Sequence, residues 1–159
     1  MANYTRGLIT GVKRFLVESN CIEGICREPT KEEIAATVGF LMVQVMTFSA
    51  VCELQKVYAP EMPLRTEAGM NVYVGEHVPM PGGVAVSYKL EEIIIAANDP
   101  SSDAWKVHIA FETLHPFMDG NGRTGRALWA WHMRKIGINP FSLSFLHRFY
   151  YQTLHHVGR

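Results

Sequence analysis

The feature that most constrains this chain is a polar, glycine-rich segment at residues 115–126, His-Pro-Phe-Met-Asp-Gly-Asn-Gly-Arg-Thr-Gly-Arg. Apolar segments flank it on both sides, from Trp105 to Leu114 and from Ala127 to Ile136, and both are expected to be helical. The segment gathers a His, an Asp, an Asn, two Arg and three Gly between these helices. That composition is unusual for a core linker and well suited to binding a polyphosphate.

The residue types in this segment indicate an anion site at the start of a helix. Gly120 and Gly122 allow a tight turn whose N–H groups can approach a ligand closely. The second helix is expected to begin near Gly122, so its unpaired N–H groups and positive dipole end face the same point. Arg123 and Arg126 lie three residues apart on the first turn, and each guanidinium can hold a phosphate through two donors.

Two further residues of the segment supply chemistry. Asp119 offers the hard oxygen ligand that Mg²⁺ takes alongside phosphates. His115 precedes Pro116, which predicts an extended conformation for His115 just after a helix. Because an imidazole titrates near neutral pH, His115 is the candidate general base.

The whole segment resembles the signature of the Fic family, His-Pro-Phe-x-Asp/Glu-Gly-Asn-Gly-Arg-x-x-Arg, with every specified position matched. The resemblance implies an all-α helical bundle that transfers AMP from ATP to a Ser, Thr or Tyr hydroxyl of a target protein. The related Doc branch transfers phosphate and carries Lys where this chain has Gly122, which favours nucleotidyl transfer here. The implied site comprises His115 as catalytic base, Asp119 for Mg²⁺, and a phosphate cradle of Gly120, Asn121, Gly122, Arg123 and Arg126.

A second motif lies near the N-terminus, Ser19-Asn20-Cys21-Ile22-Glu23-Gly24. Apolar positions at helical spacing predict a helix over residues 7–24, with Gly24 ending it. Glu23 would then lie in the last turn, where the helix dipole disfavours a negative charge. The motif resembles the Fic inhibitory motif, Ser/Thr-x-x-x-Glu-Gly/Asn, whose Glu pairs with the second signature arginine, here Arg126. That pairing would block productive binding of the ATP γ-phosphate.

Residues 69–88 differ in character from the rest of the chain. Alternating valines separated by Gly and Pro predict a β-hairpin with a long tip, whose second arm would carry Val84 and Val86. The segment resembles the Fic flap, which holds an extended segment of the target protein by strand addition. His77 is expected to be structural or target-facing. The expected docking residues are Val72, Tyr73, Val74 and Gly75.

The remaining segments are predicted to be helices. Thr30 and Glu33 form a capping box that starts one of them. The apolar stretch from Ile34 to Val57 predicts a single central buried helix with Met42 and Met46 in the core. Shorter helices are expected over Leu90–Asn98, over Asp103–Leu114 with Ser101 or Ser102 as cap, and over Phe141–His156 with Ser142 or Ser144 as cap.

Composition narrows the class of protein. A length of 159 residues with 48% hydrophobic and 19% charged residues predicts a single Fic domain over residues 1–159. Lys plus Arg equals Asp plus Glu, at 15 each, so nucleic acid is not an expected partner. No apolar run approaches the roughly 20 residues of a membrane span, so no membrane association is expected. Three cysteines without a disulfide or zinc pattern indicate a cytoplasmic protein.

The combined interpretation is a protein adenylyltransferase that uses Mg²⁺ and ATP, acts on a protein hydroxyl and is inhibited by its own Glu23. Two alternatives stay open. Glu23 could activate water so that the protein removes AMP from a target, or Glu23 could lock the site in a nucleotide-binding regulatory or toxin module. The complete signature counts against an inactive enzyme. The target, the nucleotide base and the oligomeric state, a homodimer included, are left open.

Overall fold

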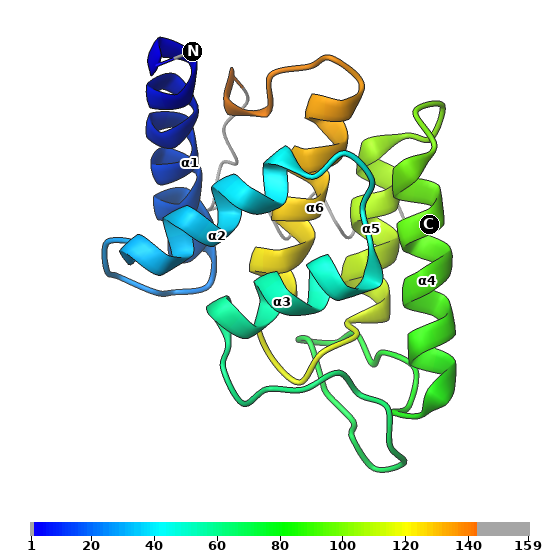
Figure 1. The fold of residues 1–159 in the computed structure, drawn as a ribbon. Helices are drawn as coiled ribbons and strands as arrows, with labels where there is room; N and C mark the ends of the chain where they lie inside the picture. Colours follow the sequence, from blue (N-terminus) through cyan, green and yellow to red (C-terminus); the bar gives the residue numbers. More distant parts are fainter. Residues whose placement is uncertain (1, 143–159) are drawn as a thin grey trace.

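The computed structural model describes residues 2–142, and these residues form six α-helices and one short 3-10 helix (Figure 1). No extended strand occurs within them, so the prediction of an all-α fold is confirmed. The elements in chain order are α1 Ala2–Ile22, α2 Lys31–Met42, α3 Phe48–Tyr58, α4 Val84–Asn98, α5 Ala104–Leu114, α6 Asn121–Lys135 and η1 Pro140–Ser142.

Helix α6 is the centre of the bundle. It contacts α1, α2, α3, α4 and α5, and Figure 1 shows it between α1 and α2 on one side and α5 and α4 on the other. Every residue from Ala127 to Trp131 is buried, so this part of the helix is covered on all sides. The first turn of α6 carries the second half of the signature, and its residues Asn121, Arg123 and Thr124 are buried as well.

The predicted single helix over Ile34–Val57 is wrong, because the chain breaks between α2 and α3. Thr47 caps α3 by accepting a hydrogen bond from the backbone of Ala50 at 3.1 Å. Asn98 of α4 exchanges two hydrogen bonds with the backbone of Met46, at 2.9 and 2.8 Å. These polar contacts satisfy backbone groups that a continuous helix would otherwise pair internally, and no apolar pattern reveals them.

The two methionines of this stretch have different environments. Met46 is 2% exposed and lies in the core as predicted, whereas Met42 ends α2 and is 49% exposed, so its predicted core position is wrong. The capping box at the start of α2 is confirmed: Glu33 N donates to Thr30 Oγ1, and Thr30 N donates to the Glu33 carboxylate.

The β-hairpin predicted over residues 69–88 is not seen. Val84 and Val86, its expected second arm, belong to α4, which begins after Gly83. The expected first arm makes one isolated bridge, between Val74 and His77 around a left-handed Gly75. The prolines at positions 79 and 81 have no N–H group to donate to a partner strand, so a regular ladder cannot extend there.

Helices α4 and α5 pack against α6 on the side opposite α1 and α2. Helix α4 begins at Val84, earlier than the predicted Leu90, and ends at Asn98 as predicted. The cap of α5 is Asp103, whose side chain accepts hydrogen bonds from two backbone N–H groups, rather than Ser101 or Ser102.

The helix predicted over residues 141–156 lies outside the described residues except for its first two, which belong to η1. Over residues 2–142, no helix combines the length and the apolar character that a bilayer crossing requires.

Candidate active site

The backbone of His115 closes the C-terminus of α5. Its φ and ψ of 49° and 61° are left-handed, and its N–H donates to Phe111 O at 2.9 Å. The extended conformation predicted from the following proline is therefore wrong. A left-handed residue at a helix end pairs a carbonyl that the helix leaves unsatisfied, and that requirement decides the conformation here.

The imidazole of His115 is oriented by the helix it terminates. Its Nδ1 lies 3.4 Å from the Glu112 carbonyl oxygen, which can only accept a hydrogen bond. That contact favours the tautomer with the proton on Nδ1, which leaves Nε2 as the basic nitrogen. Burial lowers the pKa of His115 below its ordinary value, so the ring is neutral at physiological pH and able to accept a proton.

The loop between His115 and α6 is held by buried side chains. Phe117 is 1% exposed and packs in the hydrophobic core, which anchors the loop. Asn121 accepts a hydrogen bond from Phe117 N and donates one to Phe117 O, both at 2.8 Å. The Asn121 side chain therefore shapes the loop at the start of α6. Gln55 adds a hydrogen bond from α3 to Asp119 O at 2.9 Å.

The first turn of α6 combines a glycine turn with an uncapped helix start. Gly120 has a φ of 77°, and a Cβ there would lie 3.0 Å from the Cβ of Ala59, so both conformation and space require glycine. Within the described residues 2–142, no side chain caps this N-terminus. A Cβ on Gly122 would collide with Glu23 Oε1, so the carboxylate of Glu23 lies directly against the turn. A carboxylate thus occupies the place that suits an anion.

Arg126 is buried and bound to the end of α1. Its Nε donates to Ser19 Oγ at 2.8 Å, and its NH2 donates to Ser19 O at 3.1 Å and to Glu23 Oε1 at 2.6 Å. The Arg126 side chain is fully buried and that of Glu23 is 28% exposed. The ion pair that the resemblance implied between these two residues is present. Helix α1 ends at Ile22 rather than at the predicted Gly24, so Glu23 lies just past the helix, followed by Gly24 with a left-handed φ of 70°.

Arg123 contacts different helices from Arg126. Its NH2 donates to Tyr58 O at 2.6 Å, and its NH1 lies 3.6 Å from the Glu33 carboxylate. Arg27 also binds Glu33 through two hydrogen bonds, which lower the pKa of that carboxyl. The two signature arginines therefore diverge, Arg123 toward α2 and α3 and Arg126 toward α1.

Glu112 is a buried carboxyl that the sequence interpretation did not single out. It lies in the last turn of α5, and a Cβ on Gly125 would collide with its Oε1. Burial raises the pKa of Glu112 to about 7, with Arg126 lowering it and Glu23 raising it. His108 Nδ1 is 3.9 Å away, and burial lowers the pKa of His108 to about 3, so that ring is neutral. The i, i+4 spacing of these two residues was the available signal.

Asp119 is the candidate ligand for a metal ion. Within residues 2–142, no three His, Cys, Asp or Glu side chains gather as a metal-binding cluster. Asp119 is exposed beside the start of α6, and its Oδ1 accepts a hydrogen bond from Gly120 N at 2.6 Å. Magnesium bound to nucleotides takes one or two protein carboxylates and fills its other positions with phosphate and water oxygens. A single exposed carboxylate at this position fits that requirement, and its role stays a prediction.

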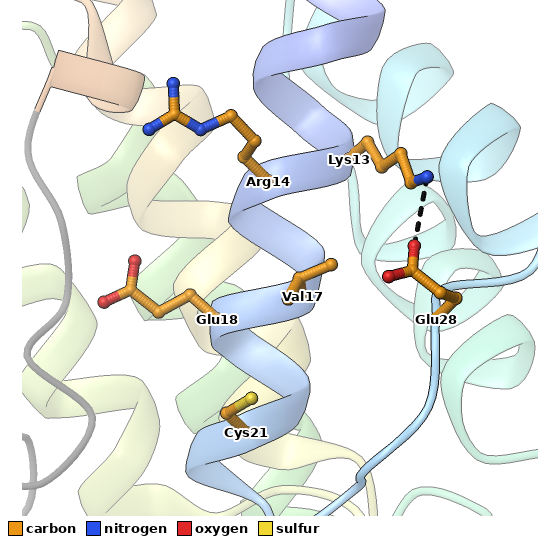
Figure 2. A pocket seen from close by; sticks show the side chains of 6 residues that line it. All are labelled: Lys13, Arg14, Val17, Glu18, Cys21 and Glu28. Carbon is orange, nitrogen blue, oxygen red and sulfur yellow. Dashed lines mark ion pairs between the residues drawn. The ribbon is translucent and has the colours of Figure 1, made fainter.

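A separate hollow of about 550 Å³ lies along α1, away from the signature. Figure 2 shows its side chains on α1 and the following loop, with Lys13 and Glu28 paired at 3.0 Å. No signature residue lines it, and charges of both signs surround it. The residues that line it are Lys13, Arg14, Val17, Glu18, Cys21 and Glu28.

The chain belongs to the Fic/DOC family, whose model matches residues 46–133. That region includes the whole signature and the segment before α4, whereas Ser19 and Glu23 precede it.

Among its relatives is "Protein adenylyltransferase fic-1" of Caenorhabditis briggsae, 37% identical over 96 residues, which cover 54% of this chain and 18% of the relative. "Protein adenylyltransferase Fic" of Aedes aegypti is 34% identical over 87 residues, which cover 51% of this chain and 17% of the relative. The protein of the same name from Drosophila willistoni is 37% identical over 76 residues, covering 44% of this chain and 15% of the relative. The chain thus matches less than a fifth of the length of each of these proteins.

Proposed function

We propose that the protein is a magnesium-dependent protein adenylyltransferase that Glu23 holds in a restrained state. The observation that carries the proposal is the juxtaposition of a neutral, half-buried His115 with the uncapped first turn of α6. A base and an anion-binding turn at opposite ends of one short loop are the two parts that nucleotidyl transfer needs. The names of the relatives, all protein adenylyltransferases, agree with this activity.

In the proposed reaction, Nε2 of His115 accepts the proton of a target Ser, Thr or Tyr hydroxyl. The hydroxyl oxygen forms a bond to the ATP α-phosphorus, and the bond from that phosphorus to the bridging oxygen of pyrophosphate breaks. The N–H groups at the start of α6 bind phosphate oxygens as their charge grows. Asp119 would hold Mg²⁺, which supplies charge neutralisation on the phosphates when bound.

The signature arginines would complete the phosphate site. Arg123, kept charged and close to the first turn by Tyr58 and Glu33, neutralises the leaving pyrophosphate. Arg126 orients the γ-phosphate, and this step requires its guanidinium to part from Glu23. Because positioning and charge stabilisation supply most of the acceleration in phosphate transfer, occupation of Arg126 by a carboxylate slows the reaction.

The proposal is tested by incubating the purified protein with α-³²P-labelled ATP, Mg²⁺ and a cell lysate. Glu23→Gly should label itself or lysate proteins more strongly than the wild type, because Arg126 becomes available to the γ-phosphate. The double variant Glu23→Gly, His115→Ala should lose labelling by on the order of 10²–10⁴-fold, since its general base is gone. Glu28→Gln is the matched control, because Glu28 pairs with the exposed Lys13 rather than with Arg126.

Two results would contradict the proposal. Full labelling by the double variant would exclude His115 as the base, and equal or weaker labelling by Glu23→Gly would exclude the restraint. The exposed part of the Glu23 carboxylate beside the α6 turn also suits it to activate water. If purified labelled target loses its AMP with the wild type but not with Glu23→Gly, Glu23 acts in AMP removal instead.

A further inference from the structure

Arg65 carries a fully buried guanidinium that donates hydrogen bonds to four backbone carbonyl groups. Its Nε donates to His115 O at 2.7 Å and its NH2 donates to Leu114 O at 2.8 Å. On the other side, its NH1 donates to Met80 O at 2.8 Å and to Met70 O at 3.2 Å. One planar group thus joins the end of α5 to the segment between α3 and α4.

The charge of Arg65 has no carboxylate partner within residues 2–142. It lies instead against the C-terminus of α5, where unpaired carbonyl groups concentrate negative partial charge. A buried cation requires such compensation. Removing it would leave the carbonyl groups of Leu114 and His115 without these donors, at the point where the candidate base is placed.

The contacts of Arg65 restrain the backbone on both sides of His115. Besides the two side-chain bonds, Arg65 N donates to Pro116 O at 2.9 Å, so three successive carbonyl groups are bound by one residue. His115 holds a left-handed conformation that residues other than glycine adopt at a cost. Rotating it back would break these hydrogen bonds, so Arg65 opposes that rotation.

The NH1 group of Arg65 joins the two ends of the segment that carries the expected docking residues. Met70 and Met80, whose carbonyl groups it binds, bracket residues 71–79. Gly83 N donates to Arg65 O at 2.9 Å, and Gly82 N donates to the Asn71 side chain at 3.1 Å, which tightens the same closure. Because both of these carbonyl groups bind Arg65, a displacement of residues 71–79 would also displace the guanidinium that holds His115.

We infer that Arg65 is a positioning residue for His115 and that it couples the docking segment, residues 71–79, to the backbone of the base. A target chain that pairs with the docking segment tightens the Met70 and Met80 contacts and thereby fixes the ring of His115 in place for proton transfer. The coupling rests on the proposed function, whereas the positioning of His115 by Arg65 is a property of the protein alone. Lysine cannot replace Arg65, since one ammonium group cannot span carbonyl groups on both sides.

The test compares the double variant Arg65→Lys, Glu23→Gly with Glu23→Gly alone by two measurements. The first is the rate of labelling of lysate protein by α-³²P-ATP over a range of ATP concentrations. The rate should fall by at least about tenfold with the KM for ATP unchanged, because a misplaced base slows chemistry rather than nucleotide binding. The second is the NMR signal of the His115 imidazole, which should shift or broaden in the absence of ATP and target.

Two further variants separate positioning from general destabilisation. Ile94→Ala, at a buried site on α4 outside the candidate site, should reproduce a loss of stability without moving the His115 signal. Asn71→Ala removes the exposed contact to Gly82 and leaves Arg65 intact. It should slow labelling several-fold and move the same signal, even if Arg65→Lys fails to fold.

An unchanged His115 signal in folded Arg65→Lys overturns the positioning role, as does a matching change in Ile94→Ala. An unchanged signal and rate in Asn71→Ala overturn the coupling. Absence of labelling by Glu23→Gly itself contradicts the proposed function, and the NMR comparison of Arg65→Lys with the wild type still decides the positioning of His115.

Discussion

The buried carboxyl of Glu112 makes the stability of the protein depend on pH in a direction that one variant can reveal. Its pKa is about 7 in the folded protein against an ordinary 4.5, because burial disfavours the charged form. The folded state therefore holds the proton more tightly than the unfolded chain. The contribution of Glu112 to the free energy of unfolding should fall as the pH rises from about 4.5 to about 7 and then level off.

The pKa difference sets the size of the effect. A rise from 4.5 to about 7 corresponds to roughly 3 kcal/mol of unfolding free energy that is lost once Glu112 is ionised. Glu112→Gln keeps the shape and stays neutral. It should exceed the wild type in stability by an amount of that order at pH 8, and the difference should shrink toward zero near pH 4. The neighbouring His108, whose pKa is about 3 in the folded protein against an ordinary 6.5, makes its own contribution to the pH dependence, and that contribution cancels in the difference between Glu112→Gln and the wild type.

The assay is urea unfolding, followed by tryptophan fluorescence at pH values from 4 to 8. Glu91→Gln, on the exposed face of α4, is the matched control and should track the wild type at every pH. The neighbouring Arg126 and Glu23 are present in both Glu112→Gln and the wild type. A Glu112→Gln advantage that does not change with pH would refute the reasoning, because packing rather than ionisation would then explain it.

Three other variants test packing and capping by the same urea assay at pH 7. Thr30→Ala should lose about 1 kcal/mol, because Glu33 N loses its acceptor at the start of α2. Asn98→Ala should lose about 1–3 kcal/mol, since both backbone groups of Met46 lose their partner. Phe117→Ala should lose about 3–5 kcal/mol, because it empties a core site. Losses below about 0.5 kcal/mol would contradict each account.

The sequence predicted those parts of the fold whose cause is local. Helix starts set by a side chain and its third neighbour, such as Thr30 and Glu33, are visible in the residue order. The start of α6 near Gly122 follows in the same way from glycines and a change in hydrophobic pattern, and the structure places it at Asn121. Periodicity, however, cannot distinguish one long apolar helix from two, and Asn98, distant in sequence, secures the break after α2.

The candidate site was predictable in its residues but not in their contacts. The motif names Arg123 and Arg126, and spacing alone suggests a shared face. Their actual directions depend on acceptors supplied by α1 and α3. Arg65 gave no signal in the sequence, because carbonyl groups of the backbone, which every residue has, are its partners.

The ion pair between Glu23 and Arg126 joins residues 103 positions apart, with the acidic partner earlier in the chain. A nascent chain emerges from the ribosome N-terminus first, so the α1 helix is available before the first turn of α6 has been synthesised. A carboxylate is therefore on hand whenever this turn folds, and no stage of synthesis contains the finished turn without Glu23. Under the proposed function, the active site is therefore inhibited from the moment it folds. Any signal that relieves the inhibition by Glu23 must act on the completed protein.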